Sequence, residues 1–459
     1  MSLEIVILAA GQGSRMKSDL PKVLHILAGK SLLEHVLCCA DELEPTKIHI
    51  VIGHQAERVR ASIDSKQMNA DIEWVQQHQQ LGTGHAVAQA LPGIDSASSV
   101  LILAGDVPLI QADTLRPLCE PDCGINLLTA VLPDASGFGR ILRDSATDAV
   151  TAIVEHKDAN QQQHSIREIN TGVMAARASQ LETWLARVKN NNAQSEYYLP
   201  DIIALAVSDN ETVNAVVTHD IVQISGINSR GDLASLERRY QRQLADALMA
   251  DGVGLADPRR IDIRGKLRTG RDCAIDINAI FEGHVTLGDR VKIGPNVLIR
   301  NSHIADDCII EANSIVDSAR IETFCQVGPF ARIRPDTHLH SRAKIGNFVE
   351  IKKSIIGEAS KVNHLAYVGD SKLGRRVNIG AGVITCNYDG ANKHQTIIGD
   401  DVFVGSDCQL VAPVEIGAGA TIGAGSTITK DAPADTLSLS RAKQIQFNNW
   451  QRPVKNQVK

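Results

Sequence analysis

Aromatic residues are scarce in this chain of 459 residues: tryptophan, tyrosine and phenylalanine together make up 3% of it. Large aromatic side chains usually fill the wide cores of globular domains. Their scarcity, together with 35 glycines, is typical of a narrow core of aliphatic side chains joined by tight turns. We therefore expect part of the chain to be a glycine-rich repeat.

The chain also lacks a long apolar run and a strong excess of charge. No stretch approaches the roughly 20 apolar residues that span a bilayer, and the first residues enter a predicted strand without a cleavable signal pattern. The formal net charge of -6 gives no electrostatic argument for nucleic acid or an anionic membrane as a partner. We expect a soluble, cytoplasmic protein that binds no nucleic acid and inserts into no membrane, and the length predicts two or more domains.

Cysteine spacings typical of zinc sites are missing as well. The nine cysteines are scattered, and neither Cys38 with Cys39 nor Cys119 with Cys123 has a matching cluster elsewhere in the sequence. We expect reduced thiols that pack as small hydrophobic residues.

Residues 4–228 alternate short apolar runs with longer stretches of helical periodicity, which predicts a Rossmann-like α/β domain with a mostly parallel sheet and helices on both faces. Ligands in such folds bind at the carboxyl ends of the strands, where the loops after Ala10, Gly53, Gln77 and Gly105 meet. The predicted strands are 4–10, 47–53, 72–77, 99–108 and 125–132, and the predicted helices are 31–43 and 82–91.

The period changes after an amphipathic helix predicted at 229–250. Beyond this connector, aliphatic residues recur every six positions from Leu287 to Ile428, with occasional slips of one residue. Such hexapeptide repeats predict a left-handed parallel β-helix whose aliphatic side chains point inward and stack from coil to coil. Residues 380–396 are too long for one repeat, and we expect them to form a loop on one face.

A glycine-containing turn follows the first predicted strand. Gly11 and Gly13 would allow backbone N–H groups to bind phosphate, but the third glycine of a dinucleotide-binding fingerprint is missing. Arg15 and Lys22 add two cations, which suit the charge that builds on a leaving pyrophosphate, so a nucleoside triphosphate is favoured over a dinucleotide. Asp106, at the end of another strand, either caps a turn or binds magnesium.

The repeat half places His364 and Tyr367 on one predicted coil. Arg334, Lys352 and Asn378 fall at comparable places on neighbouring coils. A histidine on such a surface is often only solvated, but two cations, a tyrosine and an amide beside it would bind a sugar phosphate. Imidazole, with a pKa near 6.5, suits the removal of a proton from an amine that attacks a thioester, so His364 is the predicted general base.

Several motifs extend these interpretations to a family. LAAGQGSRM, LPK, QQLGTGHA and AGDVPL resemble the signature of the sugar-1-phosphate nucleotidylyltransferases. GFGRI, IVEHKDA, EINTG and NNAQSEYYLPDI are similar to the bifunctional bacterial enzymes that unite N-acetylglucosamine-1-phosphate uridylyltransferase with glucosamine-1-phosphate acetyltransferase. The resemblance covers essentially the whole chain. It implies a uridylyltransferase domain at 1–228, a linker helix at 229–250 and a β-helix acetyltransferase domain with a C-terminal tail at 251–459.

The resemblance also implies roles for individual residues. Asp106 and Asn228 would hold magnesium, Lys22 would bind the phosphates, and Arg15 would stabilise the departing pyrophosphate. The UDP-sugar site would comprise Leu8, Ala9, Ala10, Gly11, Lys22, Gln77, Gly82, Thr83, Ala104, Gly105, Asp106, Gly139, Glu155, Asn170, Thr171 and Asn228. Around His364, the glucosamine-1-phosphate site would comprise Arg334, Lys352, Tyr367 and Asn378, and the acetyl-CoA site Ala381, Asn387, Tyr388, Ser406, Ala424 and Arg441.

The activity that follows from the resemblance has two steps, with acetyl-CoA and UTP as co-substrates. The repeat half would acetylate glucosamine-1-phosphate, and the first half would join the product to UTP, giving UDP-N-acetylglucosamine, a precursor of peptidoglycan and lipopolysaccharide. Family members are homotrimers, so the 380–396 loop would reach a neighbouring subunit. Glu350 could orient the acetyl-transfer site. The tail after Ser440 would either cover that site through Arg441 and Trp450 or fray as a free terminus.

Two other functions stay open at this point. The β-helix could be only a regulatory or oligomerisation module of a nucleotidylyltransferase, or the whole chain could be an assembly subunit without chemistry. His364 with Asn387 and Tyr388 argues against the first alternative. Arg15, Lys22 and Asp106 argue against the second.

Overall fold

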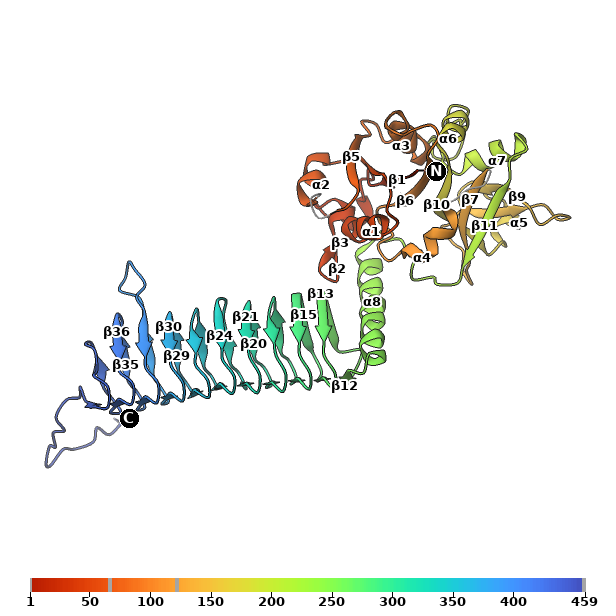
Figure 1. Cartoon of the computed structure of the whole chain (residues 1–459). Helices are drawn as coiled ribbons and strands as arrows, with labels where there is room; N and C mark the ends of the chain where they lie inside the picture. Colours follow the sequence, from red (N-terminus) through yellow and green to blue (C-terminus); the bar gives the residue numbers. More distant parts are fainter. Residues whose placement is uncertain (1, 65–67, 120–123, 456–459) are drawn as a thin grey trace. The chain divides into compact units, whose positions relative to one another are not determined.

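The computed structural model describes residues 2–64, 68–119 and 124–455. The chain divides into two compact units, Met1–Gln241 and Arg242–Lys459, which are drawn together in Figure 1. Within the described ranges, no cysteine forms a disulfide with another, and Cys123 lies outside the described residues. Within the described ranges, no helix has both the length and the apolar character that crossing a membrane requires.

The first unit is built on one mixed sheet in the order β11-β7-β10-β6-β1-β4-β5. Its β6-β1-β4-β5 part is parallel, as the sequence predicts, whereas β10 runs antiparallel to β6 and β7. The strands are β1 (Leu3–Leu8), β4 (Lys47–Ile52), β5 (Asp71–Gln76), β6 (Ser99–Ala104), β7 (Ile125–Val131), β8 (Arg140–Arg143), β9 (Val150–Val154), β10 (Glu168–Arg177) and β11 (Val213–Thr218), and a small hairpin joins β2 (Ile26–Leu27) to β3 (Lys30–Ser31).

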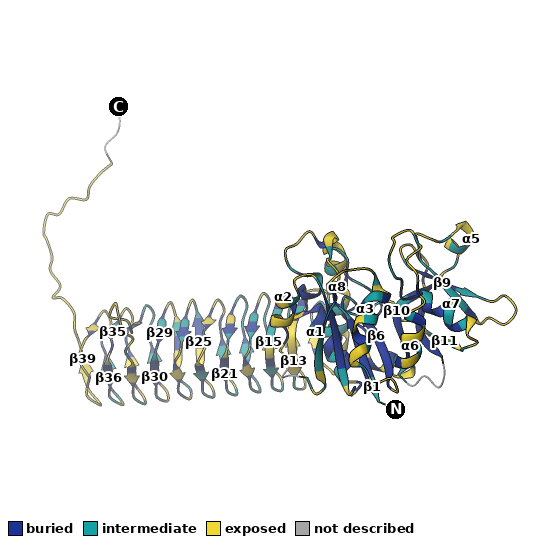
Figure 2. Cartoon of the chain, turned by 90° about the horizontal axis from the view of Figure 1, so that it is seen from above, coloured by how far each residue is buried: buried dark blue, intermediate teal, exposed yellow. Residues whose placement is uncertain are grey.

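Helices cover both faces of this sheet because its central strand is apolar on both sides. In β1, Ile5 and Ile7 pack in one core cluster with Leu37, and Val6 packs in the other with Val87. Figure 2 draws the central strands β1, β6 and β10 largely in the colour of buried residues. The helices are α1 (Leu32–Asp41), α2 (Ala56–Ser62), α3 (Thr83–Ala90), α4 (Ala112–Leu115), α5 (Gln161–His164), α6 (Ala178–Leu185), α7 (Asp201–Ser208) and α8 (Arg230–Ala250).

The second unit is a parallel β-helix whose strands form three ladders. The first ladder runs through β12 (Gly254–Leu255), β14 (Ala274–Ile275), β16 (Lys292–Ile293), β19 (Ile309–Ile310), β22 (Gln326–Val327), β25 (Lys344–Asn347), β28 (Lys361–His364), β31 (Asn378–Ile379), β34 (Phe403–Val404), β37 (Thr421–Ile422) and β39 (Leu437–Ser438). The long strands β13 (Ile261–Thr269) and β15 (Ala279–Leu287) begin the other two ladders together.

From β15 onward these two ladders separate. One contains β17 (Leu298–Arg300), β20 (Ile315–Asp317), β23 (Arg332–Ile333), β26 (Glu350–Lys352), β29 (Tyr367–Gly369), β32 (Ile384–Cys386), β35 (Gln409–Val411) and β38 (Thr427–Ile428). The other contains β18 (His303–Ile304), β21 (Ala319–Ile321), β24 (Thr337–Leu339), β27 (Ile355–Ile356), β30 (Ser371–Leu373), β33 (Thr396–Ile398) and β36 (Val414–Ile416).

The aliphatic residues of the six-residue repeat form the core of this β-helix. Every position from Leu287 to Ile428 that the repeat predicts to point inward is buried in one continuous cluster. The cluster starts earlier than expected, since Ile275 and Phe281 already belong to it. At the end of the connecting helix α8, Ala245 and Leu248 pack into the same cluster.

One predicted boundary in the β-helix is wrong. The loop expected at 380–396 begins only after Cys386, because β32 continues the coil. Thr385 takes the inward position there, with 1% of its surface exposed. Its hydroxyl accepts a hydrogen bond from the N–H of Gly369 at 2.8 Å and lies 3.1 Å from the carbonyl oxygen of Gly369. A threonine thus replaces an aliphatic residue at an inward position, because the neighbouring backbone forms hydrogen bonds with its hydroxyl. A search for aliphatic residues alone does not predict this position.

Candidate active sites

The carboxyl ends of the parallel strands are tied together by backbone hydrogen bonds. Ala9 N–H donates to Val51 at 2.8 Å, Gly105 N–H to Leu8 at 3.0 Å, and Gln77 N–H to Ile52 at 2.8 Å. These bonds bring the expected loops to one edge of the sheet, where they surround a cavity of about 290 Å³. The cavity is lined by Leu8, Ala9, Ala10, Gly11, Lys22, Val23, Gln77, Gln80, Gly82, Thr83, Ala86, Ala104, Asp106 and Glu196.

Glycine is required at two positions beside this cavity. Gly82 has φ +116°, and a Cβ there would lie 2.6 Å from the carbonyl oxygen of Tyr197. Gly13 has φ +64°, and a Cβ there would lie 2.6 Å from Cβ of Lys22. At Gly11, by contrast, a Cβ would meet no atom within 4 Å. Gly11 therefore leaves open space where a ligand could approach the backbone.

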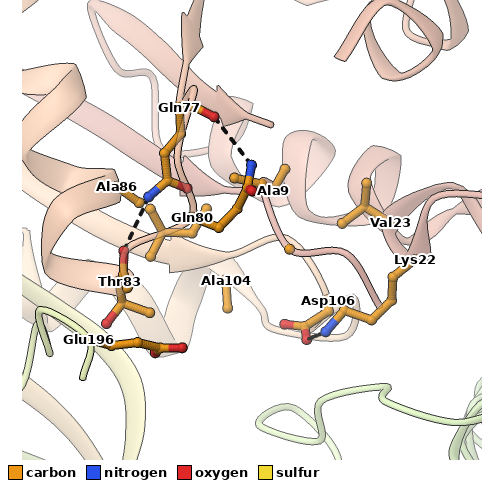
Figure 3. Close-up of a pocket in the computed structure, with 14 residues that line it drawn as sticks. Ala9, Lys22, Val23, Gln77, Gln80, Thr83, Ala86, Ala104, Asp106 and Glu196 are labelled. Atoms are coloured by element: carbon orange, nitrogen blue, oxygen red, sulfur yellow. Dashed lines mark hydrogen bonds and ion pairs between the residues drawn. The ribbon is translucent and has the colours of Figure 1, made fainter. Parts of the chain in front are cut away.

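Four polar residues from distant parts of the first unit meet at one side of the cavity. Lys22 Nζ forms an ion pair with Asp106 and lies 3.4 Å from Asn228 Oδ1. Arg15 donates from Nη2 to the same Asn228 oxygen at 2.8 Å. Figure 3 shows Lys22 and Asp106 pointing toward each other, with Gln77, Gln80 and Thr83 on the other side of the cavity. A carboxylate and an amide oxygen flanked by two cations could bind a divalent cation together with phosphate oxygens.

The residues expected around the sugar form a second group, which does not line this cavity. Asn170 N–H donates to the Gly139 carbonyl at 2.9 Å, and a Cβ on Gly139 would lie 3.2 Å from Glu155 Oε1. The hydroxyl of Thr171 donates to the Leu128 carbonyl at 2.7 Å. Burial and the nearby negative charges of Asp158 and Asp201 raise the pKa of Glu155 above its ordinary value. Gly139, Asn170 and Glu155 thus form one neighbourhood, and the Thr171 hydroxyl is engaged with the backbone.

Some residues in and near the first site are not predicted from the sequence. Gln80 and Glu196 line the cavity. The hydroxyl of Tyr198 is buried without a hydrogen-bond partner among the described residues. Burial and the charges of Asp158 and Glu155 raise the pKa of Tyr198 to about 12. Glu196 and Tyr198 lie in NNAQSEYYLPDI, a motif that supports the family resemblance but has no periodicity from which to assign roles.

In the β-helix, His364 is held by a side chain from the previous coil. Asn347 in β25 and His364 in β28 are register partners, and Asn347 Oδ1 lies 2.6 Å from His364 Nδ1. His364 is otherwise exposed. If Nδ1 carries the proton and donates it to Asn347, Nε2 is left unprotonated and free to accept a proton.

Charged residues form ion pairs on an adjoining ladder of the β-helix. Arg334 donates to Glu350 at 2.8 Å, and Lys352 lies 3.3 Å from Asp370. Glu350, expected to orient the site, therefore contacts Arg334, whereas Asn347 is the residue that contacts the imidazole. The side-chain amide of Asn387 donates to the same oxygen of Asp370 that pairs with Lys352.

The segment after Cys386 adds a second ammonium group to this cluster. It projects from the coils between β32 and β33 (Figure 1). The nearby positive charge of Lys352 lowers the pKa of Lys393, which lies in this segment. Two neighbouring ammonium groups form a suitable binding place for a phosphate group. Tyr388 donates its hydroxyl proton to the Gly390 carbonyl at 2.6 Å, which holds the turn of the segment.

Most residues expected to bind acetyl-CoA stack at one corner of successive coils. Asp407 N–H donates to the carbonyl of Ala381 at 2.7 Å, Gly425 N–H to that of Ser406 at 2.8 Å, and Arg441 to that of Ala424 at 3.3 Å. Asn378, in β31, is the register partner of Lys361 in β28, so it lies on the ladder of His364 and not on the ladder of Lys352 and Tyr367. Trp450 of the tail is 69% exposed and lies in no helix or strand.

Comparison with known families supports both halves of the chain. Residues 5–167 match the MobA-like NTP transferase domain, and residues 268–301 and 395–430 match the bacterial transferase hexapeptide of six repeats. The bifunctional protein GlmU of Marinobacter nauticus is 53% identical over 99% of this chain and 99% of its own length. The bifunctional protein GlmU of Nitrosospira multiformis is 54% identical over 99% of this chain and 98% of its own length. The chain belongs to the GlmU family.

Membership of the GlmU family confirms the resemblance seen in the sequence. The chain is a bifunctional enzyme, a uridylyltransferase with an NTP transferase domain and an acetyltransferase with a left-handed β-helix of hexapeptide repeats. A solved structure of the inositol-1-phosphate CTP transferase from T. maritima is similar to about half of this chain, with 16% identity, a TM-score of 0.41 and coverage of 51% of this chain and 96% of that one.

Proposed function

We propose that residues 251–459 acetylate glucosamine-1-phosphate with acetyl-CoA and that residues 1–228 then join the product to UTP, giving UDP-N-acetylglucosamine and pyrophosphate, with 229–250 as the linker helix. The observation that carries the proposal is the pairing of His364 with Asn347, in a chain that also holds the Arg15, Lys22 and Asp106 group. Each group suits one of the two reactions, and they lie in different units.

In the proposed acetyl transfer, His364 takes a proton from the ammonium group of glucosamine-1-phosphate. The free amine attacks the thioester carbonyl, the new C–N bond forms, the C–S bond breaks, and coenzyme A leaves as its thiol after taking up a proton. Arg334, Lys352, Tyr367 and Asn378 would bind the sugar phosphate. The corner formed by Ala381, Ser406 and Ala424, with Asn387, Tyr388 and Arg441, would bind acetyl-CoA.

In the proposed uridylyl transfer, a phosphate oxygen of N-acetylglucosamine-1-phosphate attacks the α-phosphorus of UTP in line with the departing pyrophosphate. Lys22 and Arg15 would stabilise the negative charge that builds on the leaving group. Glu155, Asn170 and Gly139 would bind the sugar, and Gln77, Gly82 and Thr83 the uracil.

The oxygen atoms of Asp106 and Asn228 fit magnesium, which prefers carboxylate and carbonyl oxygens and completes its shell with phosphate and water. Both residues contact the ammonium group of Lys22, which brings them close to each other and supports this assignment. Bound magnesium would neutralise phosphate charge. The ammonium group of Lys22 pairs with the carboxylate of Asp106 and would bind phosphate oxygens beside the cation.

The remaining parts of the proposal concern the setting of the enzyme. We infer a homotrimer, because residues expected at the acetyl-transfer site lie on different ladders of a single chain. A cytoplasmic location and a role in the supply of peptidoglycan and lipopolysaccharide, and thus in cell-wall formation and cell shape, follow from the proposed product.

The proposal is tested by measuring the two half-reactions of the purified chain separately. Free coenzyme A should appear when glucosamine-1-phosphate and acetyl-CoA are supplied without UTP. Pyrophosphate should appear when N-acetylglucosamine-1-phosphate, UTP and magnesium are supplied without acetyl-CoA. Pyrophosphate formation without acetyl transfer would instead favour a β-helix with a regulatory or oligomerisation role.

A further inference from the structure

A group of metal-binding side chains lies on the β-helix away from both proposed active sites. His338 in β24 and His340 just beyond it are two residues apart along a strand, so their side chains point to the same outer face, while the intervening Leu339 is buried. Glu322 follows β21, the neighbouring strand of the same ladder, and its N–H donates to the Leu339 carbonyl at 2.9 Å. The strands β21 and β24 are labelled in Figure 1. Their pairing places one carboxylate beside two imidazoles.

The three ligand atoms already converge. Glu322 Oε1 lies 2.9 Å from His338 Nε2 and 3.1 Å from His340 Nδ1. All three atoms lie within 4.8 Å of one another. Ligands of a tetrahedral zinc ion at bond lengths near 2.0 to 2.1 Å are about 3.3 Å apart, so only small side-chain movements would be needed.

Hydrogen bonds from Ser341 orient the carboxylate of Glu322. Glu322 Oε2 accepts hydrogen bonds from the N–H of Ser341 at 3.0 Å and from its hydroxyl at 3.1 Å. This leaves Oε1 directed between the imidazoles. Oriented carboxylates of this kind are typical of protein metal ligands.

We propose that Glu322, His338 and His340 form a binding site for a zinc ion on the outer face of the β-helix. Two neutral imidazoles and one carboxylate are ligands that zinc and neighbouring transition metals accept, whereas magnesium and calcium prefer all-oxygen sites. The side chains of Glu322 and His338 are each 30% exposed, and that of His340 is 37% exposed, so an ion can enter and water can complete the coordination. Bound zinc would connect two successive coils.

The residues next to these three ligands leave room for a divalent cation. Arg320 is the register partner of His338 and is exposed, so its guanidinium can extend into solvent. Thr323, whose hydroxyl lies 3.2 Å from that of Ser341, adds a further polar contact behind the carboxylate. None of these residues belongs to either proposed active site. The zinc site is therefore independent of the two reactions.

The test is equilibrium dialysis of the metal-stripped full-length chain with Zn²⁺ at pH 7.5, in parallel with the double variant His338→Ala/His340→Ala. The wild-type chain should bind one zinc equivalent more than the double variant. His303→Ala is the matched control, because His303 is exposed on the same ladder two coils away and should leave the stoichiometry unchanged. Equal stoichiometry in the wild type and the double variant would overturn the proposal.

Two further measurements report the ligand set itself. Co²⁺ in place of zinc should give visible d–d absorption of a four-coordinate site in the wild type, and this absorption should be lost in Glu322→Gln. Ser341→Ala should keep the ligands but loosen the carboxylate, weakening zinc binding by about 10- to 100-fold. Unaltered Co²⁺ absorption in Glu322→Gln would show that the metal binds elsewhere and would contradict the assignment.

Discussion

Among the residues that the structure describes, Asn347 is the side-chain partner of the His364 imidazole, at 2.6 Å. If this bond fixes the tautomer, Asn347→Ala should lower kcat of acetyl transfer by roughly 10- to 100-fold, part of the 10²- to 10⁴-fold that general base catalysis contributes. The pH profile of kcat should also shift, because the proton on Nδ1 loses its acceptor. Steady-state assays of coenzyme A release between pH 6 and 9 would measure both effects.

Lys344→Ala is the matched control for this prediction. Lys344 lies on the same strand as Asn347, is exposed, and is three residues away from the imidazole's partner. An unchanged pH profile in Asn347→Ala, with the same loss of rate in Lys344→Ala, would indicate a structural role for this strand and not the positioning of His364.

The ionised carboxyl of Glu155 is predicted to lower the stability of the folded protein while it contributes to substrate binding. Its pKa is raised by burial and by Asp158 and Asp201, so the ionised form costs stability at pH values above the folded-state pKa. This cost disappears as the pH falls below the unfolded value near 4.5. Glu155→Gln should therefore raise the urea midpoint at pH 8, with a smaller gain at pH 5, while it weakens binding of N-acetylglucosamine-1-phosphate.

The exposed Glu182 in α6 provides the comparison for Glu155. Glu182→Gln should change the free energy of unfolding by no more than about 0.5 kcal/mol at either pH. A decrease in the urea midpoint of Glu155→Gln at pH 8 would contradict the account of its environment.

Individual residues could be predicted from the sequence only where they belong to motifs. Asp106 stands out because it follows the apolar run of a predicted strand, and Lys22 because it belongs to the LPK motif after the glycine turn, and the structure pairs them. Asn347, Asp370 and Lys393 could not be predicted, because their importance comes from register between coils, which six-residue periodicity does not assign to single polar positions.

Among the elements, β32 is stabilised by an unusual inward residue. Thr385 is buried, and its hydroxyl satisfies the backbone of Gly369. Thr385→Val keeps the shape but leaves the Gly369 N–H without an acceptor, so the β-helix should lose about 1 to 3 kcal/mol of stability. Differential scanning calorimetry of the full chain, followed on the transition of the β-helix, would measure this loss.

The adjacent Ile384 points outward from the same strand and is 42% exposed, so Ile384→Val should leave that transition almost unchanged. A Thr385→Val chain as stable as the wild type would mean that another group, such as water, satisfies Gly369.

The elements of the chain were predictable to different degrees. Strong hydrophobic periodicity predicts the parallel strands β1, β4, β5 and β6 and the β-helix, because each buries a regular apolar face. The strands β8 to β11 were not predicted, since β8 and β9 are short and half-buried and β11 has an irregular pattern of burial. The antiparallel insertion of β10 follows from long-range pairing, which the local sequence does not encode.

At the scale of the whole molecule, an apolar ridge on the β-helix supports the proposed trimer. Phe330 and Phe348 stack with ring centroids 5.3 Å apart and are 49% and 56% exposed. Leu365, next to His364, continues the ridge on the next coil and is 62% exposed. Because exposed apolar patches beside a site are typical of subunit interfaces, Phe348→Glu should dissociate the trimer and reduce acetyl transfer.

Sedimentation velocity would measure this dissociation. The wild type should sediment with three times the chain mass of 49.5 kDa, and Phe348→Glu with a smaller mass. Phe324→Glu is the control. Phe324 is similarly exposed, at 57%, but it precedes strand β22, whereas Phe330 follows that strand. A trimer that survives Phe348→Glu would exclude the ridge as its interface.

The central claim is that one chain carries two chemically independent active sites, and the most direct measurement is of both half-reactions in two single variants. His364→Ala should abolish acetyl transfer and leave uridylyl transfer at the wild-type rate. Asp106→Ala should abolish uridylyl transfer and leave acetyl transfer unchanged. Acetyl transfer at the wild-type rate in His364→Ala, or the loss of both activities in either folded variant, would contradict the account.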